Sequence, residues 1–170
     1  MVEKKPRGNT TVKPALEVLQ EYLKAKRIKY DLSVKNAIWF SLLVPTPEVK
    51  EMPNRHVSCG IRISDDARNA LYFTATVMTV ETSEELQEAV SSFFMKFQGS
   101  GFKAGRIVVH PDGTVLYSLT QFLCEGGTLD RQAIASLLTT AIVEIAAIFM
   151  LRETMIKTLP LATVSRFGSA

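Results

Sequence analysis

Few residues in this sequence have the types and the spacing of a catalytic or metal site. His56 and Cys59 lie in a segment that alternates like a β-strand, and their separation of three residues places their side chains on opposite faces. A Cys–His pair would need His110 to approach Cys59 or Cys124, and no local motif requires this contact. Two histidines without an HxH or HxxxH spacing are weak metal ligands. We therefore expect no catalytic residue, no metal and no cofactor, and we expect both cysteines to be reduced thiols.

Several of the carboxylates occur where they support backbone structure. Asp65 and Asp66 lie in a predicted turn, and a group of glutamates (Glu81, Glu84, Glu85 and Glu88) surrounds a predicted helix start. Glu144 differs, because it interrupts the most apolar stretch of the chain, residues 133–151. Its side chain could reach solvent, pair with a basic residue of a partner chain, or lie in a pocket.

Two glycine-rich segments do not form a nucleotide-binding motif. Gly99-Ser100-Gly101 follows a predicted helix and is typical of a helix C-cap. Gly126-Gly127 precedes a helix, whose N-terminus could bind an anion, but the P-loop pattern is missing.

The composition indicates one globular domain. The chain has 170 residues, of which 46% are hydrophobic and 22% charged, and its formal net charge is +3. These values exclude disordered, collagen-like and disulfide-scaffold proteins. We expect a flexible basic arm over residues 1–11, one domain over residues 12–159, and a flexible tail over residues 160–170.

The hydrophobic periodicity predicts helices and strands in a definite order. Strand-like alternation covers residues 30–34, 37–44, 56–63 and 71–77, and a hairpin with the turn Pro111-Asp112-Gly113 joins residues 106–110 to 114–123. Helical stripes cover residues 14–28, 83–97 and 129–159. The prediction is an α+β fold with a single twisted antiparallel sheet, helices mainly on one face, and the order α-β-β-β(-β)-α-β-β-α.

The last predicted helix is apolar around most of its circumference. Such a helix is either central to a core or covered by another chain. We expect a homodimer whose interface includes four residues of this helix: Leu137, Glu144, Ile148 and Leu151. Membrane insertion is not favoured, because Thr139, Thr140 and Glu144 interrupt the apolar run.

Other apolar side chains are candidates for contact with a partner protein. Trp39, Leu43 and Tyr72 lie at the alternate strand positions that we expect to face outward. Trp39 and Leu43 could instead belong to a second core layer. Phe94 and Met95 lie off the main stripe of the second helix, which we assign to four other residues: Leu86, Val90, Phe93 and Phe97.

The charge is uneven along the chain. Residues 1–35 hold nine Lys or Arg and four Asp or Glu, whereas the remainder holds eleven and thirteen. A basic group (Lys24, Lys26, Arg27 and Lys29) coincides with the end of the first helix, where cations complement the helix dipole. No apolar segment of a secretory signal follows the basic start, so we expect a cytoplasmic protein.

The order of elements resembles that of the YbjN-like family, whose fold is shared with the small dimeric chaperones of bacterial type III secretion. The resemblance covers about residues 12–157. Its markers are the opening helix with Leu16, Leu19 and Leu23, the helix over residues 83–97, and the hairpin that leads through Glu125-Gly126-Gly127 into the last helix. The resemblance implies a non-enzymatic protein that binds an extended protein segment along hydrophobic surface, or regulates a partner.

We therefore expect a non-enzymatic protein-binding module, chaperone-like or regulatory, that holds a protein client by apolar surface and strand addition. One alternative is a small-ligand binder or enzyme with a pocket between the sheet and the last helix, using Arg62, Arg106, His56 or His110. A second alternative is a weak nucleic-acid binder that uses the basic N-terminal region.

Overall fold

A computed structural model describes residues 15–32, 36–45, 55–63, 70–122 and 129–158, together with the backbone of residues 167–168. Several sequence predictions fall outside these ranges: the basic arm, most of the tail, the turn at Asp65-Asp66, Cys124, and the glycines Gly126-Gly127.

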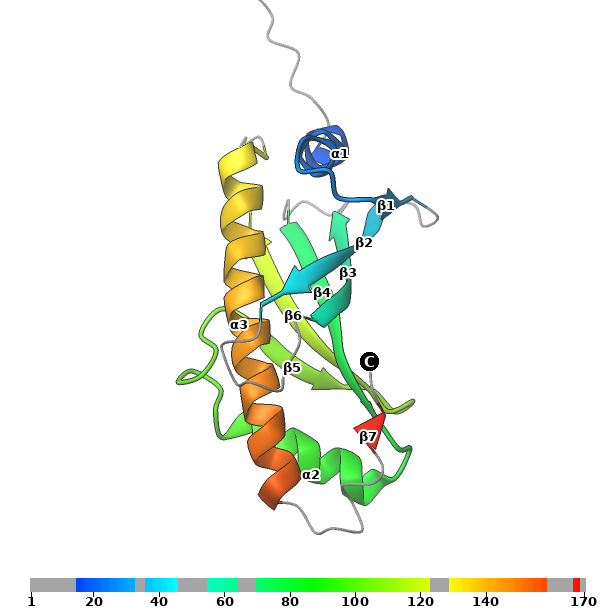
Figure 1. Cartoon of the computed structure of the whole chain (residues 1–170), viewed down its shortest axis with the longest axis vertical. Helices are drawn as coiled ribbons and strands as arrows, with labels where there is room; N and C mark the ends of the chain where they lie inside the picture. The colour runs from blue at the N-terminus through cyan, green and yellow to red at the C-terminus, as the bar shows by residue number, and fades with distance from the viewer. Residues whose placement is uncertain are drawn as a thin grey trace, which may run out of the picture.

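The strands form a single antiparallel sheet (Figure 1). Its spatial order is β1 (Tyr30–Asp31), β2 (Ala37–Val44), β3 (Arg55–Ile63), β4 (Ala70–Val80), β6 (Thr114–Phe122) and β5 (Arg106–Val109). A short β7 (Phe167–Gly168) pairs with the end of β4, within the range for which the sequence predicts a flexible tail. The predicted single sheet is confirmed, with β1 shorter than expected.

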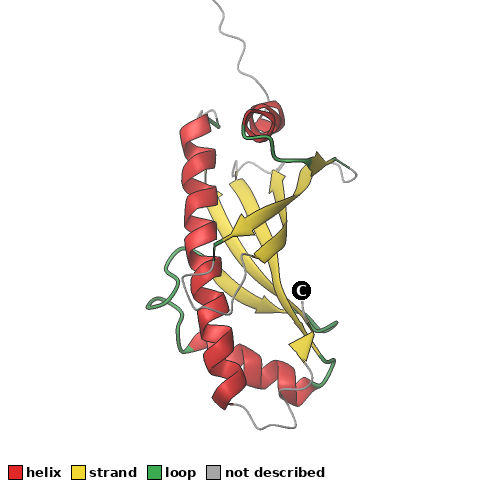
Figure 2. Cartoon of the chain, in the orientation of Figure 1, coloured by secondary structure: helices red, strands yellow, loops and turns green. Residues whose placement is uncertain are grey.

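The helices of the described chain lie along the sheet and at its ends (Figure 2). They are α1 (Ala15–Ala25), α2 (Glu84–Met95) and α3 (Arg131–Thr158). We call the face that α3 covers the inner face. The helix α3 runs along the length of the sheet, and α1 and α2 lie at opposite ends of it (Figure 1). No Pro or Gly interrupts residues 131–158, and α3 is one continuous helix of 28 residues. The predicted α+β class and element order are confirmed.

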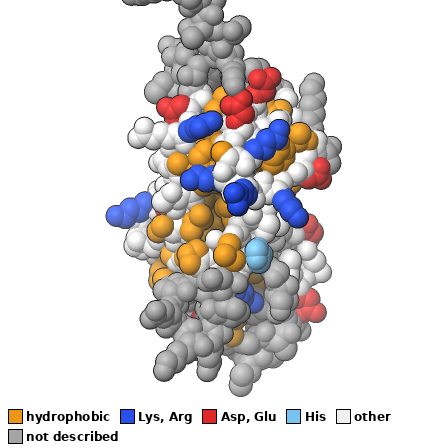
Figure 3. All heavy atoms as spheres, turned by 45° about the horizontal axis from the view of Figure 1, so that its top comes forward, with side chains coloured by type: hydrophobic (Ala, Val, Ile, Leu, Met, Phe, Trp, Pro, Cys, Tyr) orange, Lys and Arg blue, Asp and Glu red, His pale blue; other side chains and the backbone are white. Residues whose placement is uncertain are grey.

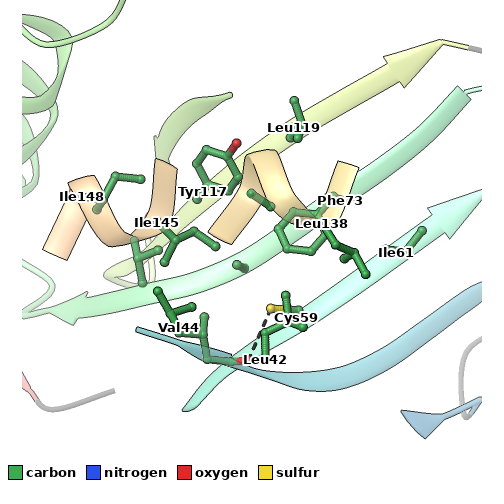
Figure 4. Close-up of a cluster of buried hydrophobic side chains, with 14 of the residues drawn as sticks. Leu42, Val44, Cys59, Ile61, Phe73, Tyr117, Leu119, Leu138, Ile145 and Ile148 are labelled. Atoms are coloured by element: carbon green, nitrogen blue, oxygen red, sulfur yellow. Dashed lines mark hydrogen bonds between the residues drawn. The ribbon is translucent and has the colours of Figure 1, made fainter. Parts of the chain in front are cut away.

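The core lies between α3 and the inner face of the sheet (Figure 4). Alternate residues of each strand point inward, so that Phe73 of β4 and Tyr117 of β6 are fully buried. Leu138, Ile145 and Ile148 of α3 pack over these strands. The period-two pattern of the sequence therefore appears in the structure as one buried and one more exposed face of the sheet.

Three of the four residues predicted for a dimer interface are buried within their own chain. Leu137, Glu144 and Ile148 are buried in their own chain, at 3%, 8% and 0% exposure, and Leu151 is half-buried. The apolar excess of this helix is mainly core, because the sheet covers the face that the sequence left to a partner chain. The large hydrophobic residues that α3 does expose are Val143 and Met150. By length and composition alone α3 could cross a membrane, but its buried side packs on the sheet.

The burial of α2 corrects one predicted contact residue. Leu86, Val90 and Phe94 are buried, so Phe94 belongs to the core and is not available to a partner. Phe93 and Phe97, which the sequence placed on the main stripe, are half-buried. The helix ends at Met95 and its C-cap residue is Lys96, so Gly99, whose φ of 85° is left-handed, lies beyond the predicted C-cap position.

Candidate functional site

The Glu144 carboxylate is bound by the backbone of a distant loop. Its Oε1 accepts hydrogen bonds from the backbone N–H groups of Lys103 and Ala104, at 2.8 and 2.9 Å. Its Oε2 accepts from the Gly105 N–H and from the Tyr117 hydroxyl, both at 2.8 Å. Of the three surroundings that the sequence left open for Glu144, the structure gives an interior one, and all four donors come from its own chain.

These contacts keep Glu144 ionised in the interior. Burial alone raises the pKa of the carboxyl, but the three backbone hydrogen bonds and the Tyr117 hydroxyl outweigh burial and lower the pKa below its ordinary value. Burial, together with the nearby carboxylate, raises the pKa of Tyr117. The Tyr117 hydroxyl therefore remains a proton donor to Glu144 across the physiological range.

The loop can reach Glu144 because residue 105 is a glycine. A Cβ atom at Gly105 would clash with the ring of Tyr117. The Gly105 carbonyl also accepts a hydrogen bond of 2.8 Å from the Gln98 side chain. Residues 103–105 are thus fixed against α3 and the inner face of β6.

This anchoring leaves part of β6 without a neighbour in the described chain. The register of β5 with β6 runs from Val109 opposite Val115 to Arg106 opposite Ser118. Continued by three residues, the same register would place residues 103–105 beside residues 119–121. Because the N–H groups of residues 103–105 point to Glu144 instead, β5 begins at Arg106. Within the described residues, positions 119–122 of β6 pair only with β4.

The backbone of Thr120 points toward this open edge. In the hairpin turn, the His110 N–H donates to the Thr114 carbonyl at 2.8 Å, so the Thr114 carbonyl faces the β5 side. Along a strand, backbone groups face one neighbour at every second residue. The N–H and C=O groups of Thr120 therefore face the space beyond the start of β5.

Two hollows flank the open edge, one on each face of the sheet. The first, which we call the outer hollow, has a volume of about 460 Å³ and is lined by Tyr72, Gln98, Ala104, Gly105, Arg106, Ser118, Thr120 and Phe122. The second, the inner hollow, has a volume of about 230 Å³ and is lined by Ala104, Leu119, Thr120, Gln121, Ser136, Leu137 and Thr140. Ala104 and Thr120 border both hollows. An extended segment lying along the edge would have one hollow on each side of it.

The outer face of the sheet carries three of the predicted contact residues. Trp39 and Leu43 are 42% and 49% exposed, and Tyr72 is half-buried and lines the outer hollow. Trp39 lies against Gly60 on the neighbouring strand, where a Cβ would come within 2.9 Å of the indole ring. Phe122, at the end of β6, is 65% exposed but was not among the predicted contact residues. Its position in the hairpin strand, in alternation with the inward residues, was the signal that could have identified it.

Met95, the other predicted contact residue, lies apart from these side chains. It is 73% exposed at the end of α2, and it borders neither hollow. The structure brings Tyr72 to the β6 edge and leaves Met95 outside this candidate site.

The residues considered for chemistry do not come together. Burial raises the pKa of the Cys59 thiol to about 12, so this thiol is a poor nucleophile. His56 and His110 are both exposed, and Arg106 alone of the four polar candidates lines a hollow. Within the described ranges, no three His, Cys, Asp or Glu residues are grouped to hold a metal ion.

The basic group at the end of α1 is solvent-exposed. Lys24, Lys26, Arg27 and Lys29 are all exposed, and Lys24 lies in the last turn of the helix, as the dipole argument expects. Figure 3, in which the α1 end of the molecule is turned toward the viewer, shows Lys and Arg side chains around hydrophobic patches.

Comparisons with known proteins identify the fold. No family model matches the sequence, and no curated protein matches it. The crystal structure of YbjN from E. coli, described there as a candidate transcription regulator, superimposes with a TM-score of 0.54 at 13% sequence identity. The match covers 86% of this chain and 97% of YbjN. The chain therefore has the YbjN-like fold that its element order resembles.

Proposed function

We propose that this protein is a non-enzymatic protein-binding module, regulatory or chaperone-like, that holds an extended segment of a partner as an added strand on β6. The observation that carries the proposal is the open edge at residues 119–122, which exists because Glu144 binds the N–H groups of residues 103–105. An added strand gains affinity from main-chain hydrogen bonds and specificity from pockets for alternate side chains. The two hollows are placed to supply such pockets.

Exposed apolar side chains extend this site across the outer face. Phe122 and Tyr72 border the outer hollow, and Trp39 and Leu43 lie farther along the sheet on β2. Apolar contact with these residues would add to the main-chain hydrogen bonds at the edge. The likeness to YbjN, described as a candidate transcription regulator, supports a regulatory role. A cytoplasmic location and a homodimer remain predictions.

Capture of partners from native lysate tests the proposal when paired with backbone variants. The Thr120 N–H points away from β4, so Thr120→Pro removes the outward N–H of the edge and no N–H that bonds to β4. Pro is tolerated where a strand faces open space. Thr120→Val keeps that N–H and the branched shape, and it serves as the matched control. We expect wild type and Thr120→Val to retain the same partners and Thr120→Pro to lose them, with circular dichroism verifying that all three fold. Retention of the same partners by a folded Thr120→Pro protein would overturn strand addition at β6.

The exposed cations at the α1 end favour a second candidate function, weak nucleic-acid binding. Such binding would weaken steeply with added salt, because each neutralised phosphate releases a counterion. A gel-shift titration at low and high salt, with a Lys24→Gln and Lys26→Gln double variant as control, tests it. No shift of any oligonucleotide at low salt would exclude this function.

A further inference from the structure

We propose that the segment bound at the β6 edge carries an acidic residue next to a small aliphatic residue, with the carboxylate facing Arg106 in the outer hollow and the aliphatic side chain in the inner hollow. This inference rests on the proposed strand addition and names the chemistry of its partner. It follows from the different linings of the two hollows and from the alternation of side chains along a strand.

The outer hollow is suited to a carboxylate. Arg106 lines it with an exposed side chain, and Tyr72, Ser118 and Thr120 add hydroxyl groups. No Asp or Glu is among the described residues that line it. A guanidinium group binds a carboxylate through two parallel charge-assisted hydrogen bonds, which makes it selective for this group.

The register brings an added residue within reach of Arg106. Arg106 lies opposite Ser118 on β6. An added residue opposite Thr120 would continue the line of β5 and would lie two residue positions beyond Arg106. Two residue positions span about 7 Å, a distance that the long side chains of Arg and Glu can span together. The side chain opposite Thr120 would point to the outer face, as do those of Ser118 and Phe122, which line the outer hollow.

The neighbouring residue of the segment would face the inner hollow. Leu119 and Leu137 form its apolar part, and Ser136 and Thr140 form its rim on α3. Its volume, about half that of the outer hollow, suits a small aliphatic side chain better than an aromatic one. No charged residue of the described ranges lines it, so a charged side chain would lose hydration there without a partner.

Charge also distinguishes a foreign segment from a second copy of this strand. The sequence of β6, TVLYSLTQF, contains no charged residue. Self-pairing of two β6 edges would therefore place no carboxylate against Arg106, whereas an acidic segment complements it. This difference in charge favours an acidic segment of a partner protein over a second copy of β6 as the occupant of the edge.

Fluorescence anisotropy with synthetic peptides tests the inference. The probe is a labelled peptide of about seven alternating Thr and Val residues, with one central Thr replaced by Glu, and its counterpart carries Lys at that position. We expect the Glu peptide to bind wild type roughly tenfold more tightly than the Lys peptide. The variant Arg106→Gln should remove this preference, and Arg106→Glu should reverse it. Arg62→Gln, an exposed arginine on the outer face of β3, is the matched control and should leave the preference unchanged.

Each outcome of this titration separates the inference from the proposed function. Binding of both peptides with equal affinity, lost in Thr120→Pro, would overturn the acidic preference and leave strand addition standing. A Glu preference that survives in Thr120→Pro would place the carboxylate at another site and overturn the inference. Failure of every peptide to bind would overturn both. Peptide-independent dimers that dissociate in Thr120→Pro, measured by sedimentation, would show that a second copy occupies the edge.

Discussion

The two faces of the sheet differ in how much of their surface the chain itself covers. On the inner face, α3 covers the strands, and even its carboxylate, Glu144, has four hydrogen-bond donors from its own chain. On the outer face, Trp39, Leu43 and Phe122 expose large apolar area, and the β6 edge presents backbone groups at Thr120. Glu144 thus has a structural role, whereas the proposed binding of a partner uses the β6 edge and the exposed side chains of the outer face.

The two faces are linked through residues 103–105. By binding their N–H groups, Glu144 completes the inner face and keeps the same residues from pairing with β6. Changes to the inner face should therefore reduce stability, whereas changes to the outer face should reduce binding with little effect on stability.

The largest expected effect is on the inner face. Glu144→Leu leaves three backbone N–H groups and the Tyr117 hydroxyl without their acceptor, and we expect a loss of about 4 kcal/mol in the free energy of unfolding. Glu144→Gln keeps one acceptor oxygen and should lose about half as much. Urea denaturation followed by circular dichroism measures both. A Glu144→Leu protein as stable as wild type would contradict the structural role of this carboxylate.

The close approach of the loop to Tyr117 gives the next prediction. Gly105→Ala forces a Cβ into the Tyr117 ring and should cost about 2 kcal/mol, as overpacking of a buried site does. Gly101→Ala is the matched control, because a Cβ there meets its nearest neighbour at 3.4 Å. Thermal unfolding of the two variants checks the difference. Equal stability of the two would show that residues 103–105 are not fixed against β6.

The ionisation of Glu144 predicts how stability depends on pH. The folded-state pKa is lower than the ordinary value of 4.5, so folding favours the charged form. This contribution is fully present above the unfolded-state pKa and is lost as the pH falls through the folded-state pKa. Urea denaturation from neutral pH into the acid range should show that the free energy of unfolding of wild type falls toward that of Glu144→Gln. A constant difference between the two proteins would contradict the assignment.

The outer face should show the smallest effect on stability. Gly60→Ala would bring a Cβ within 2.9 Å of the Trp39 ring, but this ring is partly exposed and can swing into solvent. We expect a cost of about 1 kcal/mol or less. Trp39 is the sole tryptophan, so a red shift of the emission maximum reports its displacement. An unchanged spectrum would show that the ring does not rest on Gly60.

Much of the fold could be predicted from the sequence because its signals are local. Alternation over residues 37–44 and 56–63 identified the buried face of β2 and β3, and the lack of Pro and Gly in residues 131–158 allowed a continuous α3. Which side of α2 faces the core was harder to predict. Phe93 and Phe94 both continue the spacing from Leu86 and Val90, and only packing against the sheet determines which one is buried.

The site itself could not be predicted, because it depends on contacts distant in sequence. The backbone donors of Glu144 lie 39 to 41 residues before it, and nothing in their types marks them as partners of a carboxylate. The hairpin pattern predicted a strand that begins at residue 106, but it gave no reason for residues 103–105 to bind Glu144. The one available signal was Glu144 itself, since a carboxylate in an apolar helix must find donors if it is buried.

Amide hydrogen exchange at Thr120 tests the central claim most directly. If the β6 edge is open, the Thr120 amide exchanges rapidly in the free protein, while the Tyr117 amide, inside the sheet, is protected. Addition of the Glu-containing peptide should slow the exchange of Thr120 and leave that of Tyr117 unchanged. A Thr120 amide already protected in the free monomer, or unaffected by a peptide that binds, would contradict strand addition at this edge.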